Sequence, residues 1–137
     1  MDGCIFCKIA KGEIPSSKVY EDDFVLAFLD LNPASLGHAL VIPKKHAATL
    51  LDLEPGSGEA LLQAMRKIGK ALRKVVKADG FNCLQNNFSA AGQEVMHLHW
   101  HVIPRHEGDQ VIKTWAPGKY ENMEQMAALA GQLKAEI

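Results

Sequence analysis

Short apolar-rich runs bounded by turn residues in the first third of the chain are typical of β-strands. They cover residues 18–21, 24–29 and 38–42. Asp22 and Asp23 separate the first two runs and predict a hairpin, and Pro43 limits how far the third can pair because proline has no backbone N–H. Two later runs, residues 82–86 and 97–104, bring the predicted strands to five.

Helical periodicity occurs in three places. Residues 1–17 predict a strap with a short helical turn, and residues 121–135 predict a last helix. The longest pattern covers residues 55–77, where apolar side chains recur at every third or fourth position: Leu61, Met65, Ile68, Leu72 and Val75. Because hairpin-length loops join most strands and one long helix intervenes, we expect a single α+β domain over residues 1–137 with an antiparallel sheet.

The composition restricts the class of protein further. The chain has 137 residues, enough for one core. Its formal net charge of -1 argues against a nucleic-acid polymer as partner, since such partners select strongly basic surfaces. It has no apolar run near the ~20 residues that a membrane span needs, and no export signal follows its acidic start at Asp2. We therefore expect a soluble, cytoplasmic protein without a membrane partner.

Two cysteines near the start of the chain, Cys4 and Cys7, form a C-x-x-C motif. In a cytoplasmic chain this motif indicates metal or redox chemistry, but it fills only half of a tetrahedral site. His46 and His97 are candidates for the other two positions, which would give a structural Cys₂His₂ zinc site that pins the strap to the sheet. Two reduced thiols beside a surface histidine are the alternative. Cys83, in an apolar-leaning run, is expected to be buried.

Three of the six histidines occupy alternate positions: His97, His99 and His101. On a strand, this spacing places all three imidazoles on one face. The pattern is compatible with a three-histidine catalytic zinc site, with a nucleophile that its neighbours orient, and with chance alternation on a half-exposed strand. The spacing alone leaves the metal and nucleophile interpretations open.

The residues around the triple distinguish these interpretations. The stretch from Gly92 to Ile103 reads G-Q-E-V-M-H-L-H-W-H-V-I. It closely resembles the signature of the histidine triad (HIT) family of nucleotide hydrolases and transferases. Other segments that resemble the family in the right order are residues 4–9, 12–15, 28–33 and 37–46. The resemblance runs from Cys4 to about Asp109, leaves residues 110–137 as a C-terminal extension, and implies a HIT-like fold and a homodimer.

The resemblance implies a catalytic role for each histidine of the triple. His99 would attack the α-phosphorus of a nucleotide and form a nucleotidyl-histidine that water then hydrolyses. The backbone carbonyl of His97 would orient the ring of His99. His101, with His38 behind it, would contact the phosphate oxygens. This chemistry needs no metal, so that the zinc would be structural.

The resemblance also implies nucleotide-binding residues. Gln93 and the Val95 amide would cradle the phosphate, and Asn86 would add a donor. Asp30 would accept hydrogen bonds from the ribose hydroxyls, whereas Asn32 is either a second ribose ligand or a turn residue. An apolar slot for the base, or alternatively a part of the core, would consist of Phe6, Ile9, Phe28 and Leu31.

The expected activity is hydrolysis at the α-phosphate of purine nucleoside phosphoramidates or nucleoside-monophosphate conjugates. Diadenosine polyphosphate hydrolysis is the alternative within the family, and a zinc hydrolase or a non-catalytic nucleotide sensor are the alternatives outside it. Glu94 departs from the family pattern, which has Ser or Thr there to assist the leaving group. Its carboxyl group is either an acid with a raised pKa or turned to solvent.

Overall fold

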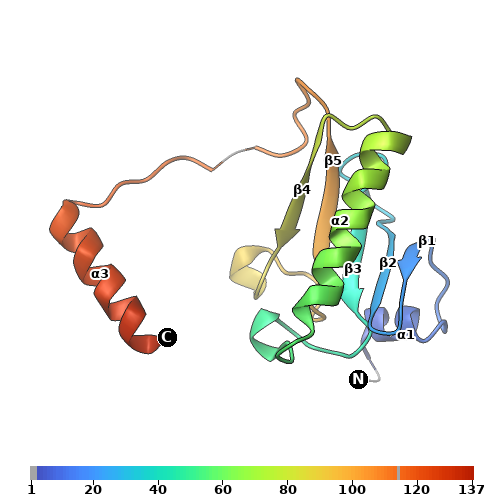
Figure 1. The fold of residues 1–137 in the computed structure, drawn as a ribbon, viewed down its shortest axis with the longest axis horizontal. Helices are drawn as coiled ribbons and strands as arrows, with labels where there is room; N and C mark the ends of the chain where they lie inside the picture. Colours follow the sequence, from blue (N-terminus) through green and yellow to red (C-terminus); the bar gives the residue numbers. More distant parts are fainter. Residues whose placement is uncertain (1–2, 114) are drawn as a thin grey trace.

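The five predicted strands form one antiparallel sheet (Figure 1). The computed structural model describes residues 3–113 and 115–137. Its strands are β1 (Lys18–Glu21), β2 (Val25–Leu29), β3 (Ala39–Pro43), β4 (Gly80–Gln85) and β5 (Trp100–Arg105). Their order across the sheet is β1-β2-β3-β5-β4, so β5 lies between β3 and the edge strand β4. The predicted α+β fold with a five-stranded antiparallel sheet is confirmed.

Helix α2 (Gly58–Val75) covers one face of this sheet. Its apolar stripe is buried as predicted, except that Val75 at the helix end is 74% exposed. The helix begins after Gly56, whose φ of 87° suits a residue without a side chain, and ends before Lys77, whose φ of 57° leaves the helical region. The chain conformation therefore limits the helix to fewer residues than the predicted 55–77.

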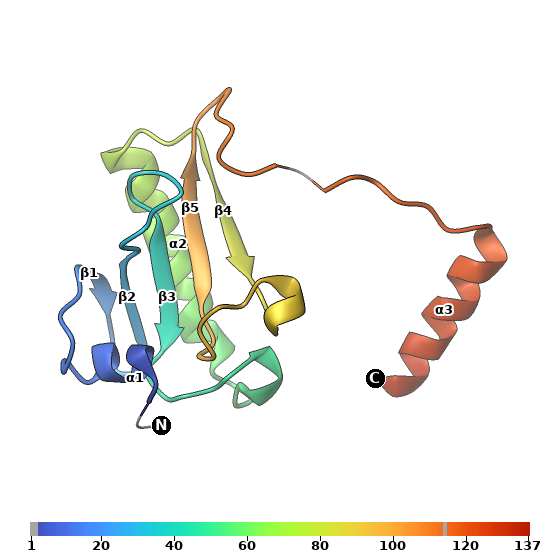
Figure 2. The ribbon, with the colours of Figure 1, turned by 180° about the vertical axis from the view of Figure 1, so that it is seen from behind.

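The opposite face of the sheet carries helix α1 (Ile5–Ala10) at one end (Figure 2). This helix is the turn predicted in the N-terminal strap. Phe6 and Ile9 of α1 pack against apolar side chains that β2 and β3 direct to that face, namely Leu26, Phe28, Leu40 and Ile42. The strap is thereby held beside the histidines.

The strand predicted over residues 97–104 begins later, at Trp100. The Leu98 N–H donates to the Ala47 carbonyl at 2.7 Å instead of joining the sheet, and the His97 side chain turns toward the cysteines. His101 pairs with Leu40 of β3 and so lies on the face that carries α1. The prediction of a strand was correct, but its start was wrong because a tertiary contact replaces the sheet pairing there.

The predicted C-terminal helix exists as α3 (Met123–Glu136). The side chain of Asn122 caps it by accepting a hydrogen bond from the Gln125 N–H at 2.8 Å. The segment before α3 leads it away from the sheet (Figures 1 and 2), and none of its residues is buried. In the described part of the chain, no helix combines the length and the apolar character needed to cross a membrane.

Candidate active site

His99 lies where β5 begins and is only 7% exposed. Its Nδ1 atom is 2.7 Å from the His97 carbonyl oxygen. Because a carbonyl only accepts, Nδ1 carries the proton and Nε2 presents a lone pair. The ring also meets Phe6 edge-on, with centroids 5.3 Å apart. These two contacts hold the imidazole in a form that can attack an electrophile.

A directed chain of hydrogen bonds lies beside His99. The Ala34 N–H donates to Nδ1 of His38 at 3.0 Å, so the His38 proton is on Nε2. That Nε2–H faces Nδ1 of His101 at 2.9 Å, and the proton of His101 is consequently on its own Nε2. The His101 ring is 5.0 Å from that of His99, centroid to centroid. A backbone amide thus makes His101 a hydrogen-bond donor beside His99.

Burial keeps these two histidines neutral. It is the main cause that lowers the pKa of His101 to about 4, and the neighbouring His99 and His38 lower it further. Burial also lowers the pKa of His38, against the opposing effect of the Asp30 carboxylate. At neutral pH both rings therefore carry one proton each, as the hydrogen-bond chain requires.

Asp30, His38 and His101 converge closely enough to be considered as a metal site. The Ala34 amide argues against that use, because it fixes the proton of His38 on Nε2, the atom that would have to bind the ion. If this proton moved to Nδ1, the N–H of the His38 ring and the N–H of Ala34 would point at each other. The cluster is better suited to ordering protons than to holding a cation.

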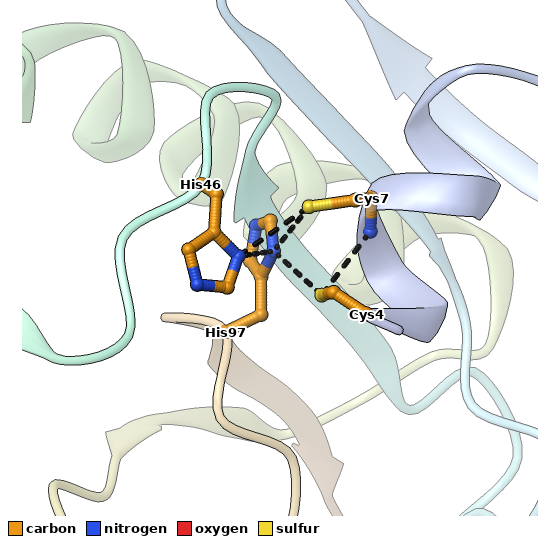
Figure 3. Close-up of side chains that lie close together, drawn as sticks. All are labelled: Cys4, Cys7, His46 and His97. Carbon is orange, nitrogen blue, oxygen red and sulfur yellow. Dashed lines mark hydrogen bonds between the residues drawn. The ribbon is translucent and has the colours of Figure 1, made fainter. Parts of the chain in front are cut away.

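A second group of metal-ligating side chains joins α1 to the start of the histidine triple (Figure 3). It contains Cys4, Cys7, His46 and His97. Nδ1 of His97 lies 3.3 Å from Sγ of Cys4, 3.5 Å from Sγ of Cys7 and 3.2 Å from Nδ1 of His46. The structure thus brings together all four residues that the sequence suggested as ligands.

These separations fit a tetrahedral zinc site. Zn–S bonds of about 2.3 Å and Zn–N bonds of about 2.0 Å give S···N edges of about 3.5 Å and N···N edges of about 3.3 Å. The Cys7–His46 pair, at 3.4 Å, agrees as well as the contacts of His97 do. A Cys₂His₂ set is also the donor chemistry typical of structural zinc.

The surroundings of the four side chains prepare them for a cation. Nε2 of His97 donates to the Pro43 carbonyl at 2.8 Å, which leaves the Nδ1 lone pair directed at the cluster. Burial, together with the neighbouring Cys4 thiol, raises the pKa of the Cys7 thiol. Two adjacent thiolates are therefore costly here unless a positive ion accompanies them.

Gln93 organises the loop that leads into the triple. Its Nε2 donates to the carbonyls of Ala48 at 2.7 Å and Val95 at 3.0 Å, and its Oε1 accepts from the Phe88 N–H at 2.8 Å. Both of its N–H groups are thus engaged by the protein. The Val95 N–H has no acceptor within residues 3–113 and 115–137, so the anchored loop presents a backbone donor.

The polar residues expected at the ribose and phosphate lie near these groups. Asp30 Oδ2 is 3.6 Å from Nε2 of His38, and Asp30 Oδ1 accepts from the Asn32 N–H at 2.9 Å. Asn32 is exposed and belongs to this turn. Nδ2 of Asn86 would lie 3.5 Å from a Cβ at Gly92, next to the Gln93 loop.

Three of the four apolar residues expected around the base gather in one place. Phe6, Ile9 and Phe28 are buried together, and Val95 packs against their cluster. Leu31 is 95% exposed and does not join them. Glu94 is exposed and its carboxylate has no hydrogen-bond partner in the described part of the chain.

Sequence reasoning missed the Ala34 amide and the Pro43 carbonyl, which fix the protons of three histidines between them. Every residue has a carbonyl and nearly every residue has an N–H, so no residue type signals such a role. The loop after β2 places the Ala34 amide, and the end of β3 places the Pro43 carbonyl.

Comparison with known proteins identifies similar chains. A family model described as the HIT domain matches residues 11–108. An adenosine 5'-monophosphoramidase of Saccharomyces cerevisiae is 45% identical over 135 residues, which is 98% of this chain and 82% of the yeast protein. A HIT family protein of Bacillus subtilis has a crystal structure with a TM-score of 0.92 and 37% identity, covering 98% of this chain and 97% of that one. The crystal structure of a zinc-bound histidine triad family protein of Mycobacterium smegmatis superposes with a TM-score of 0.78 and 36% identity, covering 99% of both chains.

Proposed function

The chain belongs to the HIT family, and from this premise we propose that it hydrolyses purine nucleoside phosphoramidates or nucleoside-monophosphate conjugates at the α-phosphate. The observation that carries the proposal is the hydrogen bond from His99 Nδ1 to the His97 carbonyl, which leaves Nε2 unprotonated. The name of the yeast relative, an adenosine 5'-monophosphoramidase, supports the substrate class.

The reaction proceeds in two displacements. Nε2 of His99 attacks the α-phosphorus, a P–N bond forms, and the bond to the leaving group breaks, with the leaving group taking up a proton. Water then attacks the same phosphorus, the P–N bond breaks and the nucleoside monophosphate is released. His101, a donor through Nε2–H, stabilises the charge on the phosphate oxygens in both steps.

The remaining site residues hold the nucleotide. The Val95 amide binds the phosphate, Gln93 keeps that amide in position, and Asn86 lies at the same loop. The carboxylate of Asp30 accepts from the ribose hydroxyls, with Asn32 at its turn. Phe6, Ile9 and Phe28 form the wall for the base, whereas Leu31, which is exposed, is not part of it.

We also propose a structural zinc ion held by Cys4, Cys7, His46 and His97. The separations of their donor atoms support it, and so does the similarity to the zinc-bound mycobacterial protein. The ion would neutralise the two thiolates and fix α1 to the sheet, and the hydrolysis uses no metal. We place the protein in the cytoplasm, where thiols stay reduced and can bind the ion. We also propose that it is a homodimer.

The proposal is tested by following adenylylation of the protein. Wild type, His99→Ala and His106→Ala are incubated with an adenosine phosphoramidate and, separately, with a diadenosine polyphosphate. Intact mass after rapid denaturation at alkaline pH, which preserves the acid-labile P–N bond, detects the covalent adduct, and released AMP gives the rate. His106 is an exposed histidine outside the site, which makes it the matched control.

We expect adduct and turnover in wild type and His106→Ala, and a loss of about a thousand-fold or more in His99→Ala. Turnover of His99→Ala at the wild-type rate would overturn the assignment of the nucleophile. Faster hydrolysis of the diadenosine polyphosphate than of the phosphoramidate would favour the other activity known in the family.

A further inference from the structure

Glu94 is bonded directly to Val95, whose backbone amide we place at the substrate phosphate. Standard covalent geometry keeps the Glu94 carboxylate within about 7 Å of the Val95 nitrogen in any rotamer. Glu94 is exposed, and an exposed carboxylate is ionised at neutral pH. A negative charge therefore lies close to any phosphate that this amide binds.

The side chain of Glu94 reaches solvent, whereas its two neighbours are held by the protein. Gln93 is buried, and its side chain is bonded to three backbone groups. Val95 packs against the apolar cluster that we propose as the wall for the base. Among the described residues, the Glu94 carboxylate has no hydrogen bond and no ion pair. It is thus free to meet the part of the substrate that the base wall does not hold, which is the leaving group.

The residues that we assign to the nucleotide carry no positive charge to balance Glu94. The His101 ring holds a single proton, on Nε2, and is neutral. The Val95 amide is neutral as well, and none of the assigned residues is a lysine or an arginine. Asp30, at the ribose, adds a second carboxylate. Because the extra phosphates of a polyphosphate need cations to balance them, this set of charges disfavours an anionic leaving group.

Phe88 adds an exposed aromatic ring to the same loop. Its N–H donates to Oε1 of Gln93 at 2.8 Å, and its carbonyl accepts from the Gln93 N–H at 3.1 Å. Phe88 has a φ of 69°, a conformation that is costly for a bulky side chain, and its side chain is 52% exposed. Aromatic rings attract ammonium groups. The loop thus carries an exposed ring and an exposed carboxylate, both of which favour a positively charged ligand.

We propose that Glu94 selects the leaving group by its charge, so that the protein prefers phosphoramidates whose amine carries a second, protonated amino group. Phe88 supplies an aromatic face to the same subsite. The inference rests on the hydrolysis proposed above and adds the class of leaving group. It also distinguishes the two activities left open by the sequence, because the leaving group of a diadenosine polyphosphate is a nucleotide anion, which the Glu94 carboxylate repels.

The test uses three adenosine phosphoramidates that share the P–N bond and a similar chain length but differ in the charge at the far end. Their amines are cadaverine, with a cationic end, hexylamine, with a neutral end, and δ-aminovalerate, with an anionic end. Release of AMP under steady-state conditions at low ionic strength gives kcat/KM for each compound.

Wild type is compared with three variants of the full chain. Glu94→Gln removes the charge and keeps the shape of the side chain. Phe88→Gly removes the ring and relieves the positive φ. Glu107→Gln removes an exposed carboxylate beyond the far end of β5 and is the matched control. Urea unfolding checks that each variant is folded.

We expect kcat/KM of wild type and Glu107→Gln to be about tenfold or more higher for the cadaverine compound than for the δ-aminovalerate compound. Hexylamine should lie between them. Glu94→Gln should reduce this ratio to about threefold or less, and added salt should reduce it in wild type. Phe88→Gly should lower kcat/KM for the cadaverine and hexylamine compounds about threefold or more.

Equal kcat/KM values of wild type for the three compounds, or a ratio that persists in Glu94→Gln, would overturn the inference while the release of AMP still supports the proposed function. A ratio that falls equally in Glu94→Gln and Glu107→Gln would assign the effect to overall charge and would overturn it too. Unchanged values in Phe88→Gly would remove the ring from the subsite. No release of AMP from any compound would refute the proposed function, and the inference with it.

Discussion

The Nδ1 atom of His99 lies 2.7 Å from the carbonyl oxygen of His97, whose own ring lies among Cys4, Cys7 and His46. A single residue therefore orients the ring of His99 through its backbone and belongs to the candidate metal-ligand set through its side chain. A change in the position of the His97 backbone would therefore also change the orientation of the His99 imidazole, which we propose as the nucleophile.

Removal of the metal should consequently slow the chemical step. We expect chelation to lower kcat about tenfold with little change in KM, because the orientation of His99 is disturbed while the nucleotide contacts remain. The melting temperature should fall at the same time, since the proposed zinc ion would fix α1 to the sheet. Elemental analysis of the purified protein and steady-state kinetics before and after chelation measure these effects.

Two cysteine variants provide the control for metal removal. Cys4→Ser should reproduce the effects of the chelator, whereas Cys83→Ser, which changes an exposed thiol away from the cluster, should not. Purified wild type without bound metal would contradict the zinc proposal. An unchanged kcat after chelation would mean that the ion does not affect the orientation of His99.

Gln93→Glu should destabilise the protein although it changes few atoms. A carboxylate oxygen would replace Nε2 and face the carbonyl oxygens of Ala48 and Val95 without a proton to share. We expect a loss of about 2–4 kcal/mol in the free energy of unfolding by urea. Gln132→Glu, at an exposed position on α3, is the control and should stay within about 0.5 kcal/mol of wild type.

Gly69→Ala tests how closely α2 approaches the sheet. A Cβ at Gly69 would overlap the ring of Phe81 on β4. Alanine favours helix by about 1 kcal/mol, but overpacking costs about 1–3 kcal/mol, so we expect net destabilisation in urea unfolding. Gly58→Ala in the same helix meets no atom within 4 Å and should be neutral or stabilising. Equal effects of the two changes would mean that the Phe81 ring moves aside freely.

Stability should fall when the pH decreases from about 6.5 to about 4. The pKa of His101 drops from its ordinary 6.5 to about 4, mainly through burial, so in this range the unfolded chain binds a proton that the folded chain excludes. Protonation then favours the unfolded state. Urea unfolding at four pH values should show a smaller decrease in His101→Asn than in wild type. Parallel curves for the two proteins would assign the acid sensitivity to other groups.

The main helix could be predicted because its hydrophobic period is regular, and the strands could be predicted because turn residues bound short apolar runs. Leu61, Met65, Ile68 and Leu72 mark the buried side of α2, and they are buried in the structure. The start of β5 could not be predicted, because the contact between Leu98 and Ala47 depends on a distant loop. Cys83 was expected to be buried, but it is exposed because β4 is an edge strand of the sheet. Nothing in the local sequence of β4 indicates its place at the edge.

The candidate site was predicted to a similar degree. Residues with distinctive chemistry, such as the C-x-x-C pair and His97, are recognisable by type and do meet in space. The occupation of the Gln93 side chain by three backbone groups was not foreseeable, because an amide side chain offers the same donors to a ligand and to a loop. Loop geometry decides between these two uses.

Phe6 and Cys7 are neighbours on α1, one against the ring of His99 and the other in the metal-ligand set. Cys4 and His97 are 93 positions apart in the chain. Helix α1 can pack against β2 and β3 as soon as those strands have been made, but the metal-ligand set is complete only once His97 has been synthesised. One short helix therefore makes contacts with early parts of the chain through Phe6 and with a much later part through Cys4 and Cys7.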